Sequence, residues 1–190
     1  MQLTIFGASG KTGRHLAWQA LAAGHHLTAV VRDPARLPVR HERLAVVVAG
    51  GLDPPAIEPA VADAGAVVSA LGPSISRDTS SIMSAGTASI LQAMRAAGTS
   101  RLVAISATDD RGTTLPYRLL VAPLLRGLLR RGYADMASME QTIRRSGVDW
   151  TILRPPRLTN SPRTGTYRQA ATPTYAAATA SPGPTWPTRS

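Results

Sequence analysis

Residues 3–13 read LTIFGASGKTG, an apolar run that breaks into three glycines with the spacing G-x-x-G-x-x-G. Helical spacing of apolar residues starts at Thr12 and continues to Gly24, a good C-terminal stop. A strand, a glycine-rich turn and an amphipathic helix in this order open a nucleotide-binding βαβ unit. The glycines let the backbone turn tightly and approach a diphosphate, and the free N–H groups of the first helical turn point at the anion.

Two other interpretations of this loop have to be weighed. Gly10-Lys11-Thr12 resembles the end of a P-loop, the phosphate-binding loop of nucleoside triphosphatases. That motif needs a glycine five residues before its Gly-Lys pair, and Ile5 occupies the position here. The P-loop is therefore excluded, and a glycine-rich turn that binds nothing remains as the alternative to a dinucleotide site.

Strands and helices are expected to alternate along the rest of the chain. Further apolar strands are predicted at residues 26–32, 44–49, 66–70, 101–106 and 148–154, and further helices at 54–63 and 82–97. A last helix is predicted to contain Tyr133, Met136, Met139 and Ile143 and to end before Gly147. Continuous apolar strands belong to a parallel sheet that is covered on both faces. We therefore expect an α/β fold, a Rossmann-type doubly wound parallel sheet with right-handed crossovers.

A chain of 190 residues suffices for a single domain of this kind. From about Thr159 the composition turns to Thr, Ala, Pro and Ser, and residues 175–190 show neither helical nor strand periodicity. Such a stretch does not bury enough apolar area to offset its ordering entropy. We predict a nucleotide-binding domain over residues 1–168 and a low-complexity, disordered tail over residues 169–190.

The composition excludes several classes of protein. The chain has no cysteine, which rules out disulfides, thiolate metal sites and a cysteine nucleophile. Its four histidines all lie within the first 41 residues without metal-ligand spacing, so no metal site is expected. We expect the first strand to begin at residue 2, and therefore expect no signal sequence. No apolar run reaches the roughly 18 residues of a membrane span, so we expect a cytoplasmic protein.

The formal charge of +10 raises the question of nucleic acid as a partner. The arginines are scattered, and aromatic residues make up only 4% of the chain, which leaves no stacking platform. No Asp or Glu follows Asp149, so the C-terminal stretch inflates the charge. We expect neither nucleic acid nor a membrane as a partner.

The segment 115–132 is unusual, with seven leucines or valines between residues 119 and 129. A helix on a membrane surface is one interpretation, because arginines flank the segment. We favour an insertion that shields the substrate side or packs against a partner, either a second copy of the chain in a homodimer or a regulatory protein.

The end of the second strand decides between NAD and NADP. Enzymes that use NAD place an acid there for the ribose 2′-hydroxyl, and enzymes that use NADP place a cation for the 2′-phosphate. Arg32 takes this position, and its planar guanidinium suits a phosphate. Asp33 follows and is expected to cap the next turn, with Arg36 and Lys11 as auxiliary cations. The sequence predicts NADP, as NADPH, with an ordinary solvated charge as the other interpretation of Arg32.

Several stretches together resemble a known family: FGASGKTG at 6–13, VVRDP at 30–34, VSALGP at 68–73, the helix at 82–97 and GVDWTILRPPRLT at 147–159. They are similar to the atypical short-chain dehydrogenases/reductases with an NAD(P)H-binding domain, nearest to the biliverdin reductase B/flavin reductase group and the NmrA-like proteins. The likeness covers roughly residues 2–168.

The resemblance implies a coenzyme that lies across the carboxyl ends of the strands. The pyrophosphate would be held by Gly7, Ser9, Gly10, Lys11 and Thr12, the 2′-phosphate by Arg32, the adenosine half by Leu52, Asp53, Ala70, Leu71 and Gly72, and the nicotinamide end by Ser106, Pro155 and Pro156.

The chain departs from the family pattern in two places. Gly51 stands where relatives carry an acid that helps to hold adenine, so that contact falls to backbone groups or to Asp53. Relatives also continue with another strand and a C-terminal helix, and the tail here resembles neither. A missing edge strand is expected to expose apolar surface and lower stability.

The usual catalytic pair of short-chain dehydrogenases, Tyr-x-x-x-Lys, is absent from the sequence, whose single lysine is Lys11. The nicotinamide carries the hydride chemistry, so an acceptor that takes its proton from water still suits the chain. Ser106 is the candidate catalytic residue, as a hydrogen-bond donor to the nicotinamide or the substrate, or else it caps the strand end. Asp135 and Glu140 either polarise a substrate or form a solvated helix face, and we favour the solvated face.

Two functions from different classes fit these observations. The first is an NADPH-dependent oxidoreductase that reduces a flavin, a quinone or a similar small planar electron acceptor. The second is an NmrA-like sensor that binds NADP(H) without turnover and signals through a protein partner. An extended-family epimerase is disfavoured by the short chain and the missing catalytic pair.

Overall fold

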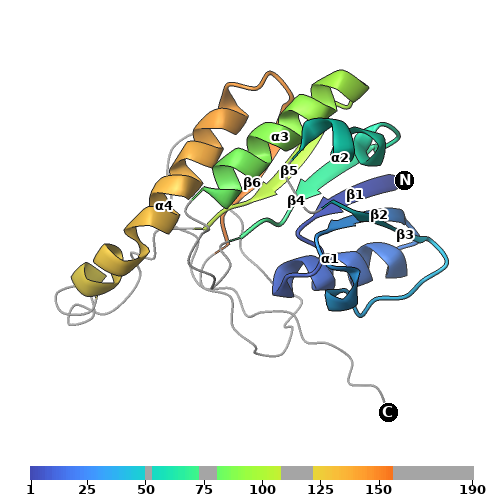
Figure 1. Cartoon of the computed structure of the whole chain (residues 1–190), viewed down its shortest axis with the longest axis horizontal. Helices are drawn as coiled ribbons and strands as arrows, with labels where there is room; N and C mark the ends of the chain where they lie inside the picture. Colours follow the sequence, from blue (N-terminus) through green and yellow to red (C-terminus); the bar gives the residue numbers. More distant parts are fainter. Residues whose placement is uncertain (50–52, 73–80, 108–121, 156–190) are drawn as a thin grey trace, which may run out of the picture. The chain divides into compact units, whose positions relative to one another are not determined.

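The computed structural model describes residues 1–49, 53–72, 81–107 and 122–155, with the backbone alone over 122–131 (Figure 1). The described strands form one sheet in the order β3-β2-β1-β4-β5-β6. Their bounds are β1 Gln2–Phe6, β2 His26–Val31, β3 Leu44–Val48, β4 Ala66–Ser69, β5 Arg101–Ile105 and β6 Asp149–Leu153. The predicted doubly wound α/β sheet is confirmed, and each strand ends within one residue of its expected position.

The strand register brings the ends of three strands to one edge of the sheet. β1 pairs in parallel with β2 on one side and with β4 on the other, and Phe6 lies opposite both Val30 and Ser69. The chain runs outward from β1 through β2 to β3, and then crosses to β4 on the opposite side. Open α/β sheets bind ligands at such a reversal of strand order, just outside the carboxyl ends of the strands.

Within the described residues, four helices and one short 3-10 helix accompany the strands: α1 Lys11–Ala22, η1 Pro34–Arg36, α2 Pro54–Val61, α3 Ile82–Ala97 and α4 Ala122–Arg144. The bounds of α3 match the prediction, because Gly98 takes a left-handed conformation (φ +72°) and stops the helix. α4 begins well before the predicted helix and includes part of the segment 115–132, whose first residues lie outside the described chain. None of the described helices is long and apolar enough to cross a membrane.

Helices cover both faces of the sheet (Figure 1). The buried side chains of the described residues form two core clusters, one on each face. On one face, α2, α3 and α4 contribute Ile57, Ile90, Met94, Met139 and Ile143, all at most 1% exposed. On the other face, α1 packs its buried Ala17 and Leu21 with β-strand residues and with Leu37. Burying a side chain of this size stabilises the fold by about 1.5–3 kcal/mol, so these helices fix the strand ends firmly.

Asp135 and Glu140 correct the prediction of a solvated helix face on α4, because both side chains are buried. Asp135 Oδ2 accepts the N–H of Met83 at 2.9 Å, and Asp135 Oδ1 accepts the N–H of Ser84 at 3.0 Å. Glu140 accepts a hydrogen bond from Arg144 at 2.8 Å. Asp135 therefore caps the start of α3 from a neighbouring helix.

The chain divides into two compact units. The first comprises residues 1–104 and 131–152, and the second comprises residues 105–130 and the chain from 153 onward. On β6, the outermost described strand of its side, Trp150 is 39% and Leu153 50% exposed. The predicted tail at 169–190, and the place where a C-terminal strand and helix are expected to be lacking, lie outside the described residues.

Candidate coenzyme-binding site

The turn after β1 requires glycine at its first position. Gly7 has a φ of +77°, in the left-handed region, and a Cβ atom there would lie 2.5 Å from the carbonyl oxygen of Ala70. The N–H of Ala70 donates to the carbonyl of Phe6 at 2.9 Å. The backbones of the two strand ends thus meet directly, and no larger side chain fits between them.

The second and third glycines bring α1 close to the loop. The N–H of Gly10 donates to the carbonyl of Gly7 at 3.0 Å and closes the turn. A Cβ atom on Gly13 would collide with the carbonyl of Gly7 and lie 2.8 Å from the Cα atom of Ala8. The helix therefore starts immediately beside the strand end, as close approach to a diphosphate demands.

The start of α1 is a suitable site for an anion. Its helical ladder begins with the N–H of Arg14, which donates to Gly10 at 2.9 Å, so the N–H groups of residues 11–13 precede the ladder. The residue at the helix start, Gly10, makes no side-chain cap, and the first turn has no acid. Lys11 is exposed, and Ser9 and Thr12 are half-buried. These donors and this charge fit a pyrophosphate.

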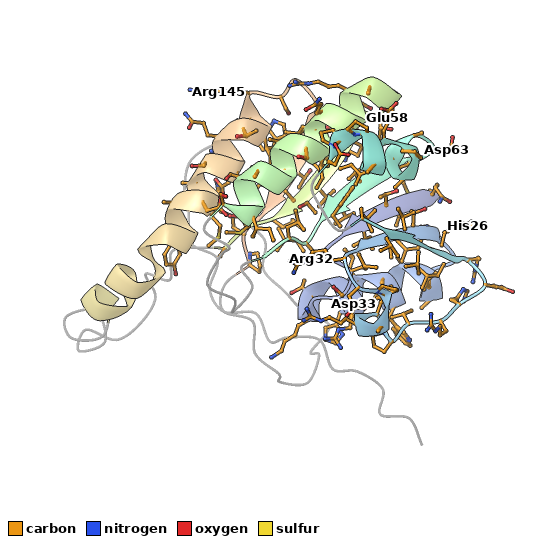
Figure 2. The ribbon with its side chains drawn as sticks, viewed as in Figure 1. His26, Arg32, Asp33, Glu58, Asp63 and Arg145 are labelled. Atoms are coloured by element: carbon orange, nitrogen blue, oxygen red, sulfur yellow. The ribbon has the colours of Figure 1, made fainter. Side chains whose placement is uncertain are left out.

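Arg32 and Asp33 lie at the end of β2, beside α1 (Figure 2). Both side chains are exposed. Asp33 Oδ1 accepts the N–H of Ala35 at 3.0 Å and starts η1, which confirms the prediction that Asp33 caps this turn. Arg36 is the last residue of η1 and is also exposed.

The residues expected around the adenosine half follow β4 and precede α2. Ala70 and Leu71 are half-buried and Gly72 is exposed. Asp53 precedes α2 and is exposed, and its side chain makes no cap there. Leu52 lies outside the described residues.

The residues expected near the nicotinamide follow β5 and β6 and belong to the second unit. The N–H of Ser106 donates to the carbonyl of Leu153 at 2.8 Å, so the structure brings these two strand ends together. Ser106 is 7% exposed, and Pro155 is half-buried. Pro156 lies outside the described residues.

Residues 7–181 match the model of a family described as NAD(P)H-binding. The chain belongs to the NAD(P)H-binding family. The match begins at Gly7, the first glycine of the turn. The predicted coenzyme class is thereby confirmed.

Two curated relatives of this NAD(P)H-binding protein match the chain over different lengths. A 3-diazoavenalumate denitrifying reductase from Streptomyces sp is 38% identical over 117 residues, which cover 56% of this chain and 38% of the relative. An uncharacterized chloroplastic protein from Arabidopsis thaliana is 29% identical over 179 residues, which cover 85% of this chain and 60% of the relative. The chain thus spans less than two thirds of either relative.

Solved structures show the same fold. A short-chain dehydrogenases/reductase from Veillonella parvula, in complex with NADP, is 25% identical with a TM-score of 0.71, over 88% of this chain and 74% of that chain. ChuY, an anaerobillin reductase from Escherichia coli O157:H7, is 19% identical with a TM-score of 0.75, over 96% of this chain and 84% of that chain. At that identity, the likeness to ChuY concerns the fold alone.

Sequence reasoning missed two features, the lowered pKa of His15 and the cap of α3 by Asp135. Burial, and secondly the positive charge of Arg14, lower the pKa of His15 below its usual 6.5 and so favour the neutral imidazole. The signal available was the basic residue directly after the last glycine. The cap of α3 by Asp135 had no local signal, because the bonded residues are 52 and 51 positions apart.

Proposed function

We propose that the protein is an NADPH-dependent reductase that transfers a hydride to a flavin, a quinone or a similar small planar acceptor. The observation that carries the proposal is the position of Arg32 relative to the glycine turn. Phe6 pairs with Val30, so Arg32 follows one residue beyond the level of Gly7 at the same edge of the sheet. A guanidinium at this position is suited to bind the ribose 2′-phosphate of a dinucleotide held by the glycine turn.

The residues of the first unit suit the diphosphate in charge and in space. Side chains are lacking at Gly7, Gly10 and Gly13, where the backbone approaches the anion, and the start of α1 offers free N–H donors. Lys11 adds an exposed positive charge at this helix start. Because no acid occurs in the first turn of α1, nothing on that turn repels a doubly charged ligand.

When bound, the reduced nicotinamide supplies the hydride, and the protein supplies binding and orientation. We assign to the hydroxyl of Ser106 a hydrogen bond to the nicotinamide amide or to the acceptor. Its pKa is far too high for it to serve as a free acid. The reduction of a flavin or quinone takes its proton from water, so it needs no Tyr-x-x-x-Lys pair, and the only lysine in the sequence is Lys11.

Two comparisons support this proposal. The Veillonella parvula protein binds NADP, and the Streptomyces relative is a reductase. Neither names the acceptor of this chain, and the planar acceptor rests on the missing catalytic pair.

The test joins coenzyme titration with turnover. NADPH and NADH are titrated calorimetrically, and NADPH oxidation is then followed with FMN, a naphthoquinone and biliverdin as acceptors. We expect NADPH to bind more tightly than NADH, and at least one acceptor to be reduced. Tight binding without turnover on any acceptor would replace the reductase by the NADP(H) sensor, and no heat with either coenzyme would remove both.

A further inference from the structure

The acid Asp33 directly follows Arg32, although an acid at the end of the second strand is typical of proteins that bind NADH. We propose that the cap made by Asp33 is a coenzyme-selectivity device. It holds the carboxylate on the backbone of η1, and so withholds it from the ribose while Arg32 faces the 2′-phosphate. The inference rests on the proposed use of NADPH and names Asp33 as a positioning residue for that choice.

The turn that holds Asp33 is fixed at both ends. At the first end, Asp33 Oδ1 accepts the N–H of Ala35 at 3.0 Å, and the carbonyl of Asp33 accepts the N–H of Arg36 at 3.2 Å. Pro34 follows the acid and fixes φ for the first residue of η1. At the other end, Leu37 is 2% exposed and belongs to the buried cluster under α1. Oδ1 of the carboxylate is therefore hydrogen-bonded to a turn that is anchored in the core.

Releasing the carboxylate would change the ribose site in two ways. An acid at the end of the second strand binds the 2′-hydroxyl of NADH. The same negative charge repels a 2′-phosphate, and this repulsion opposes the attraction by Arg32. Both effects shift the preference from NADPH towards NADH. An exposed acid beside Arg32 is thus compatible with NADPH as long as it stays hydrogen-bonded to the backbone of the turn.

Three substitutions separate the cap from the charge. Asp33→Asn keeps a capping oxygen and removes the charge, Asp33→Glu keeps the charge on a side chain too long for the cap, and Asp33→Ala removes both. Dissociation constants for NADPH and NADH are measured on the full chain by titration of the same sample. A change in the folded fraction scales both constants alike and cancels in their ratio.

We expect Asp33→Asn to keep the NADPH preference within about twofold, because Asn caps as well as Asp. Asp33→Glu should reduce the preference about tenfold, through a lost cap and a freed charge. The NADPH preference of Asp33→Ala should lie between those of the other two variants, and its affinity for NADPH should be lower by up to about fivefold. A preference that Asp33→Glu leaves intact, or that Asp33→Asn reduces as much as Asp33→Glu does, would overturn the inference.

The proposed function fails in a different way. If Arg32→Ala lowers the NADPH preference while Asp33→Glu leaves it intact, only the role of the cap is wrong. If Arg32→Ala weakens both coenzymes equally, the site for the 2′-phosphate is wrong, whatever the Asp33 variants do.

Discussion

Replacing Asp135 by Asn should destabilise the protein strongly, although the two side chains have the same shape. The carboxylate is 5% exposed and accepts two backbone N–H groups at the start of α3, at 2.9 and 3.0 Å. Asn keeps one accepting oxygen and turns an NH₂ group towards the other donor. The residue at the start of α3, Ser81, makes no side-chain cap that would compensate.

The expected loss follows from these contacts. A buried N–H that loses its acceptor costs about 1–3 kcal/mol, and the remaining bond loses its charge assistance, about 1 kcal/mol. The lost interaction of the negative charge with the helix start adds about 0.3–1 kcal/mol. The total of about 2–5 kcal/mol is a large part of the roughly 5–15 kcal/mol that stabilises a typical domain.

Urea unfolding, followed by circular dichroism, measures this loss as a lower midpoint at an unchanged slope. The matched control is Asp63→Asn, at an exposed acid just beyond α2 (Figure 2), which should change stability by less than about 0.5 kcal/mol. An Asp135→Asn variant as stable as this control would refute the assignment of Asp135 as the cap of α3.

Three further predictions concern the coenzyme site and its surroundings. Gly7→Ala should lower the free energy of unfolding by about 2–5 kcal/mol in a denaturant titration, because a left-handed alanine there also meets the carbonyl of Ala70 at 2.5 Å. The control Gly98→Ala (φ +72°, no neighbour within 4 Å) should lower it by only about 1–2 kcal/mol. Equal losses in the two variants would contradict the contact between Gly7 and Ala70. Arg32→Ala should raise the calorimetric dissociation constant of NADPH about tenfold or more and that of NADH little, and equal effects would remove the 2′-phosphate assignment. Since the pKa of His15 is lower in the folded chain, the unfolded chain binds more protons, so stability should fall as pH falls through 6.5. His15→Gln should flatten that fall in unfolding measurements at several pH values, and an unchanged slope would exclude His15 as its source.

Local patterns were enough to predict most elements of the fold. The helix at 82–97 was predictable because apolar residues recur at helical spacing and Gly98 ends it. The start of α4 was missed because Pro123 lies within the segment 115–132, and a proline inside a helix usually breaks it. Proline is tolerated in the first turn of a helix, where its missing N–H has no intrahelical partner, and α4 begins at Ala122.

The coenzyme site and its surroundings likewise contain parts that were predictable from local sequence and parts that were not. The glycine turn, the place of Arg32 at the end of β2 and the cap by Asp33 were predictable, because each depends on neighbours within a few residues in the sequence. The contact of Gly7 with Ala70 follows from the pairing of β1 with β4, which the order of strands implies. The burial of Asp135 was not predictable, because it depends on how α4 packs against α3.

The two capping acids also explain why the start of α1 suits a ligand. Carboxylates occupy the starts of η1 and α3, supplied by Asp33 and Asp135. α2 begins with two prolines, which have no N–H to offer an anion. Of the starts of α1, α2, α3 and η1, that of α1 alone combines free N–H groups, a glycine cap and no acid in the first turn. Carboxylates of the chain itself thus cap the starts of η1 and α3, whereas the N–H groups at the start of α1 are available to an anionic ligand.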